Sequence, residues 1–191
     1  MPAARAARPQ SARRTDPARR QKIITAALDV IASDGVAGAS HRKIAAAADV
    51  PLGSMTYHFS GMDELLHEAF TQFSRTVSVR IEERMAAVSD PESAARAVVD
   101  SIEEDVFGSS RDLVLTHELY TLAARDPSYR ALTNAWMTRS RAALEKHFDP
   151  QTARILDATV EGLAIHRALD TTRQPEGLAR DAVRRILAGT F

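Results

Sequence analysis

The stretch DVPLGSMTYHF, residues 49–59, gathers side chains that suit recognition better than catalysis. Ser54 and Thr56 carry hydroxyls close to Gly53, and Tyr57 and His58 add a phenol and an imidazole. These four polar side chains form hydrogen bonds, but their spacing matches neither an acid–base pair nor a set of metal ligands. The chemistry that they suit is binding to a polar surface.

Catalytic motifs are missing from the rest of the sequence as well. The chain has six His and 25 Asp and Glu, but no Gly-rich phosphate loop, no Gly-x-Ser-x-Gly elbow and no His-Glu-x-x-His. We therefore expect no enzyme, no cofactor and no metal site, and an enzyme is kept only as a minor alternative.

The elements that must position these residues are all helical. No segment alternates with period two, and prolines and glycines separate segments with helical apolar spacing. The predicted all-α fold has helices near residues 16–35, 40–48, 51–58, 62–88, 91–107, 111–124, 128–147, 151–170 and 176–188.

Local signals predict how the short helices begin and turn. Ser40 is expected to cap the second helix, and Asp49 to take the left-handed conformation of a tight turn. Pro51 is expected to begin the third helix, where its missing N–H costs nothing. Ser60 and Asp63 have capping-box spacing at the start of the fourth helix.

Two short helices joined by a tight turn after a longer helix form a helix-turn-helix, whose second helix enters the DNA major groove. There the glycine permits close approach, the hydroxyls reach bases or phosphates, and Leu52 and Met55 contact a thymine methyl. Tyr57 and His58 are expected to hold phosphate oxygens. The alternative is a helical hairpin inside a bundle. The predicted DNA-contacting residues are Ser40, His41, Arg42, Lys43, Pro51, Leu52, Gly53, Ser54, Thr56, Tyr57 and His58.

Charge is divided unevenly along the chain. Residues 1–60 carry nine Lys and Arg against four Asp and Glu, whereas residues 61–191 carry sixteen against twenty-one. A basic front on an acidic body favours an anionic partner for the front. For residues 1–15 a solvated, disordered basic tail explains the composition equally well.

The composition also indicates a compartment. The chain has 191 residues and no cysteine, which favours a reducing environment. No apolar run is long enough for a membrane span, and the N-terminus has no apolar core of a secretory signal. We expect a cytoplasmic protein without a membrane partner.

Residues 20–66 resemble the tetracycline-repressor (TetR-type) family of bacterial transcriptional regulators. That family combines an Ile/Leu-Ala-Ala-Leu helix, a glycine, a Thr/Ser-x-x-x-Ile-Ala helix, a Gly-Val turn and a Gly-x-Leu-Tyr-x-His-Phe helix. The residues at the corresponding positions here are Ile24, Ala26, Ala27, Leu28, Gly35, Ser40, Ile44, Ala45, Val50, Gly53, Met55, Tyr57, His58 and Phe59.

Four positions depart from the family pattern. Asp49 stands where the turn usually has glycine, and Thr56 stands where an aromatic residue is common. Ala39 and Met62 replace a threonine and a lysine that often bind phosphate. These departures bear on the operator and the affinity for it rather than on DNA binding as such.

The resemblance implies a division into a tail at 1–15, a DNA-binding domain at 16–61 and an effector-binding and dimerisation domain at 62–191. Helix 151–170 is apolar on two faces, and the second face calls for a cover such as a symmetry mate. The alternative is that both C-terminal helices are buried within one subunit. The expected dimer residues are Ile155, Ala158, Gly162, Ile165, Leu169, Ala182 and Ile186.

The resemblance also implies a small-molecule effector pocket in the C-terminal domain. For each aromatic candidate the alternative is an ordinary place in the core. The candidates are Phe73, Phe107, Leu113, His117, Tyr120, Trp136 and Met137. The expected function is a repressor that binds a palindromic double-stranded DNA operator as a homodimer and is released by its effector. An architectural DNA-binding protein without an inducer is the main alternative.

Overall fold

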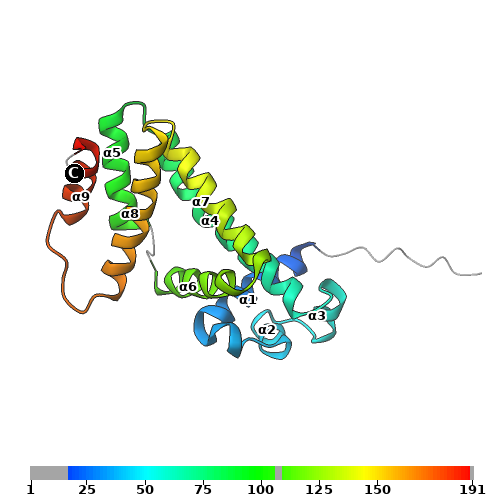
Figure 1. The fold of residues 1–191 in the computed structure, drawn as a ribbon. Helices are drawn as coiled ribbons and strands as arrows, with labels where there is room; N and C mark the ends of the chain where they lie inside the picture. Colours follow the sequence, from blue (N-terminus) through cyan, green and yellow to red (C-terminus); the bar gives the residue numbers. More distant parts are fainter. Residues whose placement is uncertain (1–16, 106–108, 190–191) are drawn as a thin grey trace, which may run out of the picture.

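The computed structural model describes residues 17–105 and 109–189, and this part of the chain is built from nine α-helices without a strand. The expected all-α fold is confirmed. The basic tail at 1–15 and Phe107 lie outside the described residues. The helices are α1 Pro17–Gly38, α2 His41–Ala47, α3 Gly53–His58, α4 Met62–Ala86, α5 Pro91–Asp100, α6 Ser110–Arg125, α7 Pro127–Leu144, α8 Pro150–Leu169 and α9 Leu178–Ala188 (Figure 1).

Ser40 and Asp49 act as predicted, whereas α1 continues beyond its predicted end at residue 35. Gly35 breaks α1 with φ 70° and ψ 170°, and a last turn then continues to Gly38. The Ser40 side chain accepts a hydrogen bond from the Lys43 backbone N–H and so caps α2. Asp49 takes φ 49° in the turn that follows, the left-handed conformation expected of it.

The starts of α3 and α4 differ from the prediction. The third helix begins at Gly53 rather than Pro51, because the Pro51 carbonyl only accepts a turn hydrogen bond from the Ser54 N–H. At α4 the partner of Ser60 is Glu64 and not Asp63. The Glu64 carboxylate accepts from the Ser60 N–H at 2.7 Å and from its hydroxyl at 2.6 Å.

Later helices also end differently from the prediction. The segment expected as one helix over 91–107 is α5 followed by a π-helical turn, η1, at Ser101–Asp105. Three of these helices begin in the same way, because Asp90, Asp126 and Asp149 each cap a helix whose first residue is proline. Such caps depend on a few neighbouring residues, so the sequence shows them directly.

Two apolar clusters lie at the two ends of the molecule, and α4 and α7 span both (Figure 1). One cluster joins α1, α2 and α3 to α6 and to the nearer parts of α4 and α7, with Phe70, Ile44 and Met55 fully buried. The other joins α5, α8 and α9 to the far parts of α4 and α7. The first core therefore continues across residue 61, and the helix-turn-helix packs directly on C-terminal helices.

Within the described ranges, none of the helices is long and apolar enough to cross a membrane.

Candidate nucleic-acid interface and interior pocket

Helix α3 exposes one side of the helix-turn-helix to solvent. Leu52 is 55% exposed and Tyr57 is 40% exposed. Pro51, Gly53 and Thr56 are exposed as well, and Ser54 is half-buried. No side chain would block a group approaching Gly53, since even an added Cβ would meet no atom within 4 Å. This is a surface that a second molecule can reach.

Two residues expected to contact DNA, Met55 and His58, lie on the buried side of α3. Met55 is 0% exposed in the core, so it offers no apolar contact to a base. His58 is 8% exposed, and its ring packs edge-on against Tyr57 with the centroids 4.9 Å apart. Its Nδ1 has no hydrogen-bond partner among the described residues. Of the two residues expected to hold phosphate, only Tyr57 is presented at the surface.

The N-terminal part of α2 adds positive charge beside α3. Arg42 and Lys43 are exposed and His41 is half-buried, while the Ser40 hydroxyl is occupied as the helix cap. The Lys43 Nζ lies 2.6 Å from a carboxylate oxygen of Asp34 and lowers the pKa of that carboxyl group by hydrogen bonding. In the free protein Lys43 is therefore ion-paired with Asp34 on α1.

The helix-turn-helix is held from behind by Phe59 and Arg20. Phe59 is 3% exposed, and the Arg20 guanidinium lies over its ring, 4.7 Å from the centroid. The same guanidinium hydrogen-bonds Glu68 and lies 3.6 Å from Glu64, both on α4. This arrangement fixes α3 against the start of α4.

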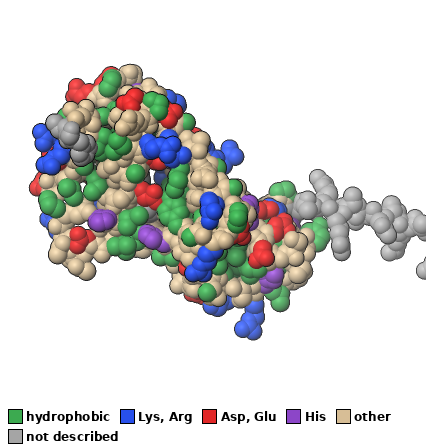
Figure 2. All heavy atoms as spheres, viewed as in Figure 1, with side chains coloured by type: hydrophobic (Ala, Val, Ile, Leu, Met, Phe, Trp, Pro, Cys, Tyr) green, Lys and Arg blue, Asp and Glu red, His purple; other side chains and the backbone are tan. Residues whose placement is uncertain are grey.

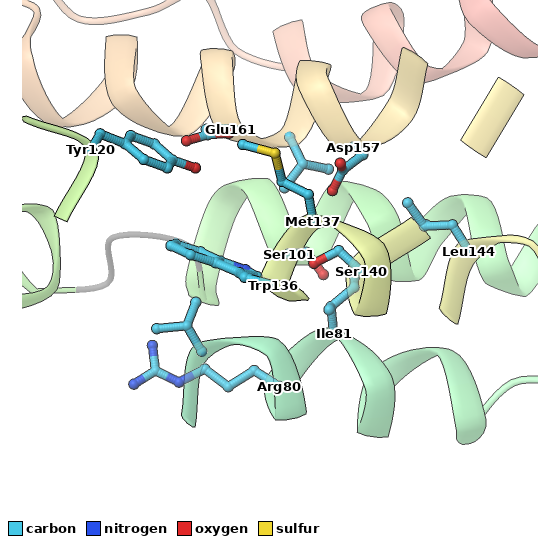
Figure 3. Close-up of a pocket in the computed structure, with 12 residues that line it drawn as sticks. Arg80, Ile81, Ser101, Tyr120, Trp136, Met137, Ser140, Leu144, Asp157 and Glu161 are labelled. Atoms are coloured by element: carbon cyan, nitrogen blue, oxygen red, sulfur yellow. The ribbon is translucent and has the colours of Figure 1, made fainter. Parts of the chain in front are cut away.

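An interior pocket lies between α4, α6, α7 and α8 (Figure 3). Its volume is about 60 Å³. Its lining residues are Val77, Arg80, Ile81, Ser101, Tyr120, Trp136, Met137, Ser140, Leu144, Asp157, Val160 and Glu161.

The candidate effector residues do not all lie in this pocket. Tyr120, Trp136 and Met137 line it. Phe73 packs edge-on against Trp136 from the core, with the ring centroids 6.4 Å apart, and does not line it. Leu113 and His117 line a separate, open hollow together with Glu118 and Leu169.

Two carboxylates of the pocket were not among the sequence candidates. Asp157 and Glu161 stand one turn apart on α8 (Figure 3). The Glu161 carboxylate lies beside Tyr120, and Asp157 lies near Met137 and Ser140. Burial raises the pKa of Asp157 to about 6, although Arg141 opposes the shift. Burial likewise raises the pKa of Glu161, opposed by a hydrogen bond from the Tyr120 hydroxyl. The i, i+4 spacing of the two acids, which places them on the same side of α8, was a signal that could have identified them.

The outer side of α8 and α9 leaves apolar side chains uncovered. Leu169 is 59% exposed, and Ile155 and Leu187 are each 40% exposed. In Figure 2 apolar side chains reach the surface over this part of the molecule. Of the other residues expected in a dimer contact, Ala158 is exposed and Gly162, Ile165, Ala182 and Ile186 are half-buried.

The part of the chain that the structure describes holds no group of three or more His, Cys, Asp or Glu placed to bind a metal ion.

Two family models match the sequence. The one described as bacterial regulatory proteins, tetR family, matches residues 23–69. The one described as tetracyclin repressor-like, C-terminal domain, matches residues 89–189. The first match includes the exposed face of α3, and the second includes Tyr120, Trp136 and both pocket carboxylates.

Solved structures and curated relatives agree with these matches. A transcriptional regulator from Streptomyces coelicolor A3(2) is 54% identical, with 89% of this chain and 98% of that chain covered and a TM-score of 0.82. The multidrug binding protein EbrR, crystallised with imidazole, is 39% identical with 90% and 96% coverage and a TM-score of 0.71. The HTH-type transcriptional regulator BetI 1 from Chromohalobacter salexigens is 26% identical over 179 residues, which cover 89% of this chain and 87% of the relative.

Proposed function

Since this chain belongs to the tetR family of bacterial regulatory proteins, we propose that it represses transcription by binding a palindromic operator as a homodimer, and that a small-molecule effector releases it. The observation that carries the proposal is the exposed face of α3, which packs against the start of α4, the helix that continues to the interior pocket. Residues 16–61 bind the operator, and residues 62–191 bind the effector and form the dimer.

The DNA contact divides into positioning and reading. Tyr57 at the end of α3, together with Arg42 and Lys43 on α2, contacts phosphates and sets the position of α3 in the major groove. The hydroxyls of Ser54 and Thr56 and the exposed Leu52 reach base edges. The Thr56 hydroxyl is 3.3 Å from the Gly53 carbonyl in the free protein, so it exchanges a weak intrahelical bond for a contact to DNA.

The dimer forms through the outer faces of α8 and α9. Exposed Ile155, Leu169 and Leu187 support this, because apolar side chains grouped on one surface mark an interaction site. The two recognition helices of a two-fold dimer enter successive major grooves about 34–36 Å apart, which accounts for a palindromic operator. A repressor of chromosomal genes works in the cytoplasm, where that DNA lies.

The effector site is the pocket between α4, α6, α7 and α8. The related protein EbrR has been crystallised with ethidium, with proflavin and with malachite green, which supports a small aromatic effector for this chain. Two helices lead from the pocket to the helix-turn-helix. α4 carries Ile81 at the pocket and begins directly behind α3. α6 carries Tyr120 at the pocket and bonds α1 through Arg111 and Asp29, at 2.8 Å.

The test uses DNA from the intergenic region upstream of the protein's own gene. Fluorescence anisotropy with this fragment should show saturable binding that competitor DNA of unrelated sequence removes only at large excess. Binding that is equally tight to unrelated DNA would favour an architectural protein instead. A screen for compounds that raise the melting temperature then separates a sensor from a protein without an inducer.

A further inference from the structure

The pocket carries negative charge that the protein itself only partly balances. Asp157 lies 3.9 Å from Arg141, a distance at the limit of an ion pair. Glu161 has no ion pair within the described residues, and its buried Oε1 has no hydrogen-bond partner there. Arg80 lines the wall on α4, but it bonds Asp112 on α6 at 2.8 Å (Figure 3). The Glu161 carboxylate accepts a hydrogen bond from the Tyr120 hydroxyl, but that group carries no charge. Burying a carboxylate without a close opposite charge is costly, so this arrangement lacks a positive group beside Glu161.

Two aromatic rings line the pocket close to Glu161. Tyr120 and Trp136 are stacked, with their ring centroids 6.0 Å apart and their planes 16° apart. Aromatic faces attract cations, and Trp does so most strongly. A cation between these rings and the α8 carboxylates would contact both. A neutral ligand would leave the carboxylates unbalanced, and an anion would be repelled by them.

We propose that the effector is a lipophilic organic cation whose positive charge is bound by Glu161 and Asp157 and whose aromatic groups pack against Tyr120 and Trp136. This inference rests on the proposed function, since it names the chemical class of the effector for the same pocket. The charge lies toward α8, and Arg80 on the opposite wall disfavours the reverse orientation.

The small size of the pocket explains how such a ligand would act. A cavity of about 60 Å³ is far smaller than the roughly 300–1,000 Å³ of sites for drug-sized ligands. A bulky cation must therefore separate α8 from α4 and α7 on entry. Met137 is flexible and stands between the two carboxylates, so it is the side chain best able to move aside (Figure 3).

The binding test uses tetraphenylphosphonium, whose charge does not depend on pH, and the uncharged triphenylphosphine oxide. Both are titrated by calorimetry into the full-length protein without DNA. The phosphonium should bind at least about tenfold more tightly, because a charge pair in a desolvated site is strong. Equal binding of the two compounds, or tighter binding of the oxide, would overturn the proposal.

Two variants assign the charge contact. Glu161→Gln and Asp157→Asn keep the side-chain size but remove the charge, and each should weaken phosphonium binding by about tenfold while leaving oxide binding within about twofold. Glu82→Gln is the matched control, because its Oε1 is also buried without a partner but Glu82 does not line the pocket. Circular dichroism and melting curves show that each variant folds. Unchanged phosphonium binding in both pocket variants contradicts the assignment.

A pH titration gives a second readout. The groups that act on the two carboxyls are Arg141, Arg154, His117, Tyr120 and each other. Because the pKa of Asp157 is about 6, that carboxyl loses its charge as the pH falls through this value. Phosphonium binding should therefore weaken between pH 8 and pH 5, whereas oxide binding stays constant. Phosphonium binding that is flat across this range would overturn the proposal.

The operator assay separates a failure of this inference from a failure of the proposed function. If the phosphonium binds as described but leaves operator affinity unchanged, the cation site stands and effector release fails. If the oxide releases the operator while the phosphonium neither binds nor releases it, effector release stands and the cation site fails.

Discussion

The buried carboxyl of Asp157 lowers the free energy of unfolding when it is charged. Its pKa in the folded protein is raised to about 6 by burial, from an ordinary value near 3.8. The folded state therefore binds more protons than the unfolded state between these values, and stability falls as the pH rises through that window.

Asp157→Asn should remove this penalty. At pH 8 the variant should be more stable by about 1–3 kcal/mol. The rise in pKa from 3.8 to about 6 corresponds to at most about 3 kcal/mol, and the loss of the weak contact to Arg141 reduces the gain. Near pH 4 the gain should vanish, because Asp157 is then neutral in the folded protein. Urea unfolding at the two pH values measures this, and a variant that is less stable at pH 8 would show that the Arg141 contact outweighs burial.

The proposed contact between α3 and DNA can be tested at the exposed residues of α3. Tyr57→Phe removes a hydroxyl expected on phosphate, so it should weaken binding to operator and to unrelated DNA alike. Ser54→Ala or Thr56→Ala should instead change the preference among operator variants by about 1–3 kcal/mol if either side chain reads a base. Anisotropy titrations at one salt concentration distinguish the two patterns. Wild-type binding by both Tyr57→Phe and Gly53→Glu would remove α3 as the recognition helix.

Among the elements, α1 depends on a conformation that only glycine adopts easily. Gly35 has φ 70° and ψ 170°, and an added Cβ would lie 2.8 Å from Glu118 Oε1 on α6. The Glu118 side chain can rotate away, but the backbone strain cannot be relieved in this way.

Gly35→Ala should therefore destabilise the protein by about 1–3 kcal/mol and loosen the packing of α1 against α6. Gly61→Ala is the control, because Gly61 is extended with open space around it and should change stability by only about 0.5 kcal/mol. Thermal unfolding compares the two. Equal effects would mean that the break in α1 is not strained for alanine.

The same elements show what a sequence can reveal. Ser40 and Asp49 were predicted because a cap or turn depends on residues only a few positions away. The burial of Met55 and His58 was missed because it depends on which side of a six-residue helix meets the core. Asp157 and Glu161 were missed because their role depends on α6 and α7, which approach α8 only in the folded chain.

At the scale of the whole molecule, the proposed homodimer can be tested by a substitution on the outer face of α8 and α9. Gly162→Arg introduces a long charged side chain into the proposed contact and should shift the protein toward monomer, or impair folding if the dimer is obligate. Ala131→Arg is the matched control, because Ala131 is exposed on α7 and away from this face. Sedimentation measures both variants. A wild-type monomer at micromolar concentration would contradict the proposed dimer.

Effector release requires that the two ends of the molecule exchange free energy. α4 and α6 each contact the pocket and the helix-turn-helix side. In the proposed dimer, a ligand that separates α8 from α4 would therefore change the spacing of the two recognition helices. A coupling of about 1–3 kcal/mol would lower operator affinity about 5- to 150-fold, and thermodynamic linkage requires operator to lower ligand affinity by the same factor. Calorimetric titration of tetraphenylphosphonium with and without saturating operator measures this factor directly. Tyr120→Phe, which removes the hydroxyl bonded to Glu161, should weaken the ligand response while ligand-free operator binding stays intact. Equal ligand affinities in the two titrations would mean that this pocket, even when occupied, does not control DNA binding.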